Sequence, residues 1–109
     1  MNEIDNIINK IKKFNDERDW EQFHNPKDLA ISISVEANEL LECFLWKQPE
    51  EASTDKIKEE LADVLILAFQ MAYKCGLDVE DIVNAKLALN AQKYPVEKAK
   101  GRITKYDKL

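Results

Sequence analysis

The stretch SVEANELLECFLWK, residues 34–47, has apolar side chains at helical spacing, yet it places the ionisable Glu36 beside them. At 100° per residue, six apolar residues form one stripe: Leu29, Ile33, Ala37, Leu40, Leu41 and Phe44. Glu36 lies at the edge of this stripe, Glu39 follows on the same flank, and Glu42 points toward solvent. We therefore predict a helix from Pro26 to about Lys47 that turns two carboxylates toward its packed side.

A second acidic pair lies in the next predicted helix, from about Asp55 to Cys75. The core stripe of this helix contains Ile57, Leu61, Val64, Ala68, Met71 and Cys75. Further apolar residues extend almost around the helix, so it should be the most buried one. Glu60 and Asp63 share one flank, because residues three apart lie on the same face of a helix. Two helices thus each present two carboxylates on one face.

The rest of the chain adds two predicted helices, one over about residues 4–14 and one from Asp78 to Tyr94. Ser53 or Thr54 can cap the start of the third helix, and Gly76 can close it. With 109 residues, 45% of them hydrophobic, and only two glycines and three prolines, the chain is long enough for one core. We predict an all-α fold resembling a four-helix bundle, as a single domain over residues 1–109 with a basic tail over about residues 95–109.

Charge and composition exclude several partners. The net charge is −5, with six basic against two acidic residues over 93–109, so that the first 92 residues carry −9. This acidic body argues against nucleic acid as a partner. The longest apolar run, near LADVLILAFQMA, is too short to cross a bilayer, so no membrane is expected. Cys43 and Cys75 lack zinc or redox spacing, and two reduced thiols favour the cytoplasm.

The four acids admit a structural and a metal-binding interpretation. On an exposed helix such pairs usually meet Lys or Arg, but Lys47, Lys56, Lys58 and Lys74 lie only near the helix ends. Desolvated carboxylates without cations would have to be protonated or bind metal. Oxygen ligands without His or Cys suit Mg²⁺, with Mn²⁺ as a possible substitute. A di-iron site would need a Glu-x-x-His pattern, which His24 does not provide.

The spacing of these acids resembles that of a known family. E-x-x-E in EANELLE is followed, after twenty residues, by E-x-x-D in EELADVL, as in the all-α nucleoside triphosphate pyrophosphohydrolases of the MazG-like superfamily. The segments ERDWEQFHNPKDL, ECFLWK, EELADVLI and KYP, in this order, look like the dCTP pyrophosphatase branch. The resemblance runs from about Phe14 to Tyr106.

This resemblance implies an activity and a set of site residues. Glu36, Glu39, Glu60 and Asp63 would be the catalytic acids and Mg²⁺ ligands. The enzyme would convert a nucleoside triphosphate, dCTP or a 5-modified dCTP, to the monophosphate and pyrophosphate. The following residues match positions at the nucleotide site: Trp20, His24 and Trp46 near the base, and Lys86, Asn90, Lys93, Tyr94 and Lys105 near the phosphates.

Some alternatives stay open from the sequence. Leu67 stands where relatives can carry a tyrosine near the base, which puts a strict cytosine preference in doubt. A dUTPase-like or broad-specificity pyrophosphatase is the rival within the enzyme class, and a non-catalytic helical binding module is the rival outside it. The apolar third helix predicts subunit association. Because relatives form dimers or dimers of dimers, we expect a homotetramer, or else a dimer, whose subunits share the active site.

Overall fold

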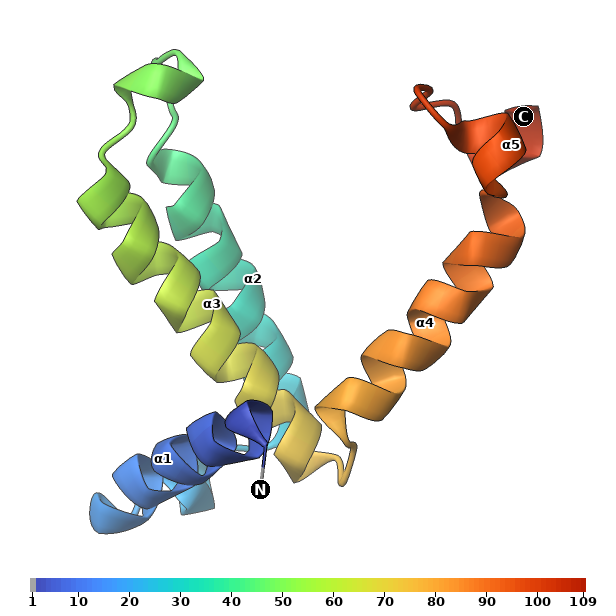
Figure 1. The fold of residues 1–109 in the computed structure, drawn as a ribbon. Coiled ribbons are helices and arrows are strands. Elements are labelled where there is room, and N and C mark those ends of the chain that lie inside the picture. The colour runs from blue at the N-terminus through green and yellow to red at the C-terminus, as the bar shows by residue number, and fades with distance from the viewer. Residues whose placement is uncertain (1) are drawn as a thin grey trace. The chain divides into compact units, whose positions relative to one another are not determined.

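The computed structural model describes residues 2–109, and the chain divides into two compact units, Met1–Leu77 and Asp78–Leu109. The first unit contains α1 (Glu3–Glu17), α2 (Pro26–Glu42) and α3 (Thr54–Lys74), with 3₁₀ turns at Glu21–Phe23 and Pro49–Glu51. The second contains α4 (Val79–Lys93), the short α5 (Val96–Ala99) and a 3₁₀ turn at Tyr106–Lys108. Every regular element in the described part of the chain is helical, which confirms the predicted all-α class (Figure 1).

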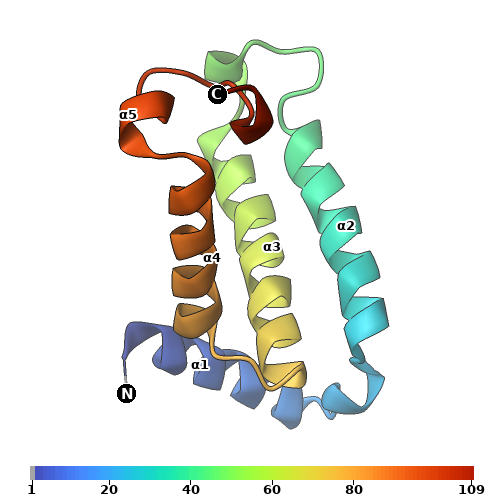
Figure 2. The same ribbon diagram turned by 90° about the vertical axis from the view of Figure 1, so that its right-hand side faces the viewer.

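In the first unit, α2 and α3 form an antiparallel hairpin, and α1 lies across the end where α2 begins and α3 finishes (Figures 1 and 2). Local signals place the helix ends. The Asn25 side chain accepts a hydrogen bond from the Asp28 backbone N–H (2.9 Å), and Ser53 Oγ accepts one from Lys56 (3.4 Å). Gly76 leaves α3 with φ of +68°, a conformation that glycine adopts without strain. The predicted starts of α2 and α3 are therefore confirmed.

The predicted end of α2 is wrong. The helix stops at Glu42 instead of Lys47, and the following turn is held by short-range bonds such as Phe44 N–H to the Leu41 carbonyl (2.9 Å). Trp46 adopts φ of +62°, outside the helical region. Pro49 requires an extended Gln48 (ψ 154°), which excludes a helix beyond Lys47, but nothing local in the sequence accounts for the earlier stop at Glu42.

The core of the first unit is small. Leu29 is 2% exposed, and Ile11, Cys43 and Ala72 are also buried. Leu41 and Leu61, predicted as core residues, are 56% and 43% exposed, so this part of the prediction is wrong for the isolated chain. The helical wheel identified the apolar face of each helix but not which flank its neighbour would cover. The acid-bearing flanks of α2 and α3 are partly buried instead.

Apolar surface remains uncovered on each unit. The first unit exposes Ile31, Val35 and Leu65, and the second exposes Val83 and Leu87. Within residues 2–109, no helix is both long and apolar enough to cross a membrane.

Candidate metal and nucleotide site

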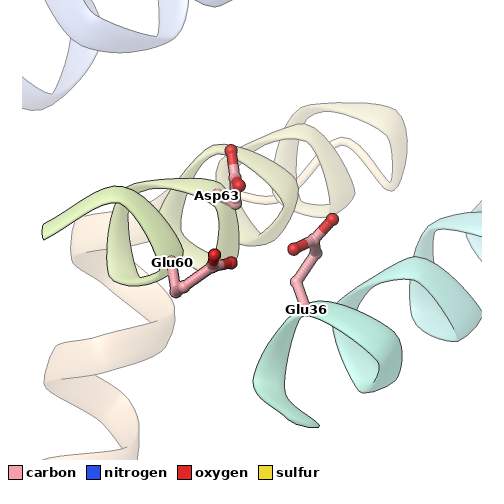
Figure 3. Close-up of side chains that lie close together, drawn as sticks. All are labelled: Glu36, Glu60 and Asp63. Atoms are coloured by element: carbon pink, nitrogen blue, oxygen red, sulfur yellow. The ribbon is translucent and has the colours of Figure 1, made fainter. Parts of the chain in front are cut away.

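Three carboxylates meet between α2 and α3 (Figure 3). Glu36 comes from α2, and Glu60 and Asp63 come from successive turns of α3. One carboxylate oxygen from each residue lies within 4.8 Å of the others. The i,i+3 spacing aligns the α3 pair, and the antiparallel hairpin brings Glu36 opposite it. The arrangement concentrates negative charge in a space that one divalent ion can fill.

The cluster lacks positive charge on its buried side. Glu36 Oε2 and Glu60 Oε2 are buried and receive no hydrogen bond from any residue that the structure describes. Lys56 Nζ lies 3.7 Å from Glu60 Oε1, but the lysine side chain is 63% exposed while that of Glu60 is 13% exposed. An unpaired buried carboxylate oxygen is unfavourable unless a proton or a cation reaches it. The site therefore has the electrostatics of a cation site.

Glu39 lies beside the three clustered acids. Hydrogen bonding with Glu36, together with the charge of Glu36, raises the pKa of Glu39, because a shared proton relieves the repulsion. Burial raises the pKa of Glu60, and so does Glu39, while Lys56 opposes the shift. The structure thus brings all four predicted acids into one neighbourhood, with Glu36, Glu60 and Asp63 closest together. The Glu39 side chain is close enough to interact with the side chains of Glu36 and Glu60.

The donor set fits a hard cation. All of the clustered ligand atoms are carboxylate oxygens, which suit Mg²⁺ or Mn²⁺. A di-iron centre is a poorer fit, because His24 is the chain's one histidine and its Nδ1 lies 3.2 Å from Gln70 Nε2. The residues present can hold Mg²⁺ through Glu36, Glu60 and Asp63, with Glu39 adjacent.

Two pockets border the acids. Asp63 lines an open pocket of about 500 Å³ whose walls are mainly apolar. The other residues around this pocket are Ile7, Lys10, Ile11, Phe14, Asn15, Trp20, His24, Ile66, Leu67 and Gln70. Glu39 and Glu60 line a second pocket, of about 460 Å³, which also contains Lys47 and Lys56. The acid cluster thus adjoins an apolar pocket and a polar one.

The three residues predicted to lie near the base do not all line the same pocket. Trp20 lines the apolar pocket, and its ring meets Phe14 edge-on, with centroids 5.7 Å apart. His24 lines the same pocket and is partly buried. Trp46 is fully exposed on the turn after α2, where the sequence had placed it on the helix. A role for Trp46 at the nucleotide site remains a prediction.

The predicted phosphate contacts all belong to the second unit. Lys86 lies in a shallow hollow with Ile82, Val83 and Leu87, and the Asn90 carbonyl accepts from Tyr94 N–H at 2.8 Å. Lys93 Nζ lies 4.8 Å from the centre of the Tyr106 ring, and Tyr94 meets that ring edge-on. Lys105 precedes the last 3₁₀ turn. A phosphate-binding role for these residues remains a prediction.

A polar network that was not predicted from the sequence lies next to the apolar pocket. Tyr73 donates its hydroxyl proton to Glu21 Oε1 (2.5 Å), Lys74 Nζ lies 2.7 Å from Glu21 Oε2, and Asn15 Nδ2 donates to the Tyr73 oxygen (3.2 Å). Desolvation opposes ionisation of Glu21, but Lys74 and Tyr73 lower its pKa overall. Burial and the bond to Glu21 raise the pKa of Tyr73 to about 12. One signal was visible, because Gln70 interrupts the apolar run LILAFQMA and a buried amide requires partners.

Comparison with known proteins agrees with this geometry. A sequence model of the MazG-like family matches residues 31–109. Rat dCTP pyrophosphatase 1 is 39% identical over 107 residues, and human dCTP pyrophosphatase 1 is 36% identical over 105 residues. In both cases the alignment covers 89% of this chain and 62% of the relative, so the chain spans less than two thirds of their length.

A solved structure is also similar. A pyrophosphatase from Archaeoglobus fulgidus superposes with a TM-score of 0.77 at 32% identity, covering 87% of this chain and 94% of that one. The helical architecture, the paired acidic motifs and these matches agree, and the chain belongs to the MazG-like family.

Proposed function

We propose that the protein is a Mg²⁺-dependent nucleoside triphosphate pyrophosphohydrolase that releases pyrophosphate and leaves the nucleoside monophosphate. The observation that carries this proposal is the group of three carboxylates within 4.8 Å of one another, with Asp63 also lining an apolar pocket. A triphosphate and such a cluster repel each other unless divalent cations lie between them. The similarity to dCTP pyrophosphatases and to an archaeal pyrophosphatase supports the same reaction.

Glu36, Glu60 and Asp63 would hold the metal, with Glu39 as a fourth acid beside them. Bound Mg²⁺, or Mn²⁺ in its place, supplies charge neutralisation for the phosphates and acidifies a coordinated water. The carboxylates would hold this cation on the α2–α3 hairpin, where it offsets their repulsion of the phosphates. An acid that is not fully engaged in binding the cation can accept the proton of the attacking water.

The pockets suggest how the nucleotide lies. A pyrimidine base needs a flat apolar partner, and Trp20 offers one in the pocket that Asp63 also borders. The phosphates would then pass the acids toward the second pocket, where Lys47 and Lys56 carry positive charge. Lys86, Asn90, Lys93, Tyr94 and Lys105 are proposed as further phosphate contacts.

We take dCTP, or a 5-modified dCTP, as the preferred substrate, in line with the curated relatives. Leu67 lines the apolar pocket and has no hydrogen-bonding group, so recognition of the base edge falls to other side chains. A dUTPase-like or broad-specificity enzyme is the second candidate, because an apolar wall at this position does not distinguish one pyrimidine edge from another.

We further propose that the protein functions as a homotetramer, or else a dimer, in the cytoplasm. Exposed apolar residues on both units, among them Ile31, Leu65 and Leu87, support association because water would otherwise cover them. Two free thiols, Cys43 and Cys75, suit a reducing compartment. Sedimentation analysis showing a stable monomer would contradict an active site shared between subunits.

The activity is tested by measuring pyrophosphate release from dCTP, 5-methyl-dCTP, dUTP, dTTP and the ribonucleotides with Mg²⁺. Glu60→Gln and Asp63→Asn should each abolish turnover without loss of helical circular dichroism. Glu59→Gln is the matched control, because the side chain of Glu59 neighbours Glu60 in sequence but is 71% exposed. Full activity in the two site variants, or no turnover of any nucleotide by the unmodified protein, would favour the non-catalytic helical module.

A further inference from the structure

His24 and Gln70 meet in the wall of the apolar pocket. Gln70 Nε2 lies 3.2 Å from His24 Nδ1, and both side chains line the pocket that also contains Trp20 and Asp63. Gln70 is only 3% exposed, so its amide must find partners within the protein. A neutral histidine has one donor and one acceptor nitrogen. Whether Gln70 donates to His24 Nδ1 or accepts from it therefore determines which ring nitrogen is protonated.

Donors and acceptors can be assigned in the neighbouring polar network around Glu21 and Tyr73. Lys74 Nζ lies 2.7 Å from Glu21 Oε2 and favours the ionised carboxylate, which can only accept. Tyr73 therefore gives its single hydroxyl proton to Glu21. The Tyr73 oxygen is left as an acceptor, and Asn15 Nδ2 donates to it at 3.2 Å.

Gln70 extends this chain to the histidine. Gln70 also acts to lower the pKa of Tyr73, as an N–H donor near the phenol oxygen does, which agrees with an amide NH₂ on this side. The same nitrogen faces His24 Nδ1. An amide nitrogen can only donate, so this contact uses an N–H of Gln70. His24 Nδ1 is then an acceptor, and the proton of the neutral ring resides on Nε2.

We propose that Gln70 is a positioning residue for base recognition, which holds His24 as the Nε2–H tautomer so that the ring offers a donor to the nucleobase. This inference rests on the proposed function, with the base in the apolar pocket. A donor suits the unprotonated N3 of cytosine and opposes the N3–H of uracil or thymine. Leu67 offers no polar group in the apolar pocket. His24, held by Gln70, therefore supplies the group that distinguishes cytosine from uracil or thymine.

The tautomer can be measured directly, because His24 is the only histidine in the chain. Nitrogen-15 NMR of the imidazole at a pH where the ring is neutral should show Nε2 protonated and Nδ1 unprotonated in the unmodified protein. Gln70→Leu should give a mixture of tautomers, and Gln70→Glu should place a proton on Nδ1, since a carboxylate only accepts. Gln92→Leu, at an exposed position in α4, should leave the spectrum unchanged. An Nδ1–H ring or a tautomer mixture in the unmodified protein would overturn the proposal.

The consequence for specificity is measured without catalysis. The dissociation constants of dCMP and dUMP should differ in favour of dCMP, and this ratio should fall about fivefold in Gln70→Leu. An unchanged ratio alongside a changed tautomer overturns the specificity role. If Gln70→Leu does not fold, as judged by circular dichroism, the Gln70→Glu protein decides both measurements. Failure of the proposed hydrolysis would appear separately, as absence of pyrophosphate release, while the NMR and binding results still decide the role of Gln70.

Discussion

Replacing Tyr73 with phenylalanine tests the buried network that supports the pocket wall. The hydroxyl donates to the carboxylate of Glu21 at 2.5 Å and accepts from Asn15 at 3.2 Å. The substitution keeps the ring, over which Lys12 Nζ lies, and removes only the oxygen. It leaves the Asn15 amide, in a residue 3% exposed, without this acceptor.

The expected cost follows from these contacts. A hydrogen bond to a charged group contributes about 1.5–3 kcal/mol, and a buried donor left unsatisfied adds to the loss. Burial and the bond to Glu21 raise the pKa of Tyr73 from 10.0 to about 12, so the hydroxyl keeps its proton at pH 7. We expect Tyr73→Phe to lower the free energy of unfolding by about 2 kcal/mol. For a domain of this size the melting temperature would fall by about 8–16 °C.

Urea unfolding of the unmodified protein and the variant at pH 7 measures this difference. Tyr106→Phe is the control, because Tyr106 contacts Tyr94 and Lys93 through its ring, and its cost should be near zero. The raised pKa means that the stabilisation by Tyr73 is full below pH 10.0 and is lost as the pH rises through about 12. A loss in Tyr73→Phe below about 0.5 kcal/mol would refute the assigned hydrogen bonds.

Three further predictions concern the metal site and the core. Mg²⁺ at a hundred times its dissociation constant should stabilise the protein by about 2.7 kcal/mol, and Glu36→Gln should lose most of this in a thermal melt; an unmodified protein indifferent to Mg²⁺ would contradict the site. Because the pKa values of Glu39 and Glu60 are raised, the stability that they give the metal-free protein is full below pH 4.5 and falls as the pH rises through the shifted values. Urea unfolding across this pH range should show a smaller fall in stability for Glu60→Gln than for the unmodified protein. An equal fall would contradict the raised pKa assigned to Glu60. Leu29→Ala should cost about 2–5 kcal/mol in urea unfolding, because the side chain is 2% exposed, and a cost below 1 kcal/mol would contradict its place in the core.

Local chemistry made much of the fold predictable. Pro26 begins α2 and Ser53 caps α3 as expected, and the i,i+3 spacing already placed Glu60 and Asp63 on one face. The end of α2 could not be predicted in this way, because the apolar period continues beyond Glu42 although the helix stops there. Trp46 was misplaced for that reason.

The pocket wall depended on contacts between distant residues. His24 and Gln70 are 46 positions apart, and Asn15 and Tyr73 are 58 apart. Helical periodicity describes the faces of single helices and contains no information on which residues of two helices meet. A buried amide within an apolar run indicates that a partner exists, but only the packing of α1 and the following turn against α3 identifies it.

The proposed role of the acid cluster is to support release of pyrophosphate from a nucleoside triphosphate. Phosphorus-31 NMR of dCTP incubated with the purified protein and Mg²⁺ tests it most directly. We expect dCMP and pyrophosphate to appear in equal amounts, with neither formed by Glu60→Gln. Release of orthophosphate, or unchanged dCTP and unchanged nucleotides of every other base, would contradict it.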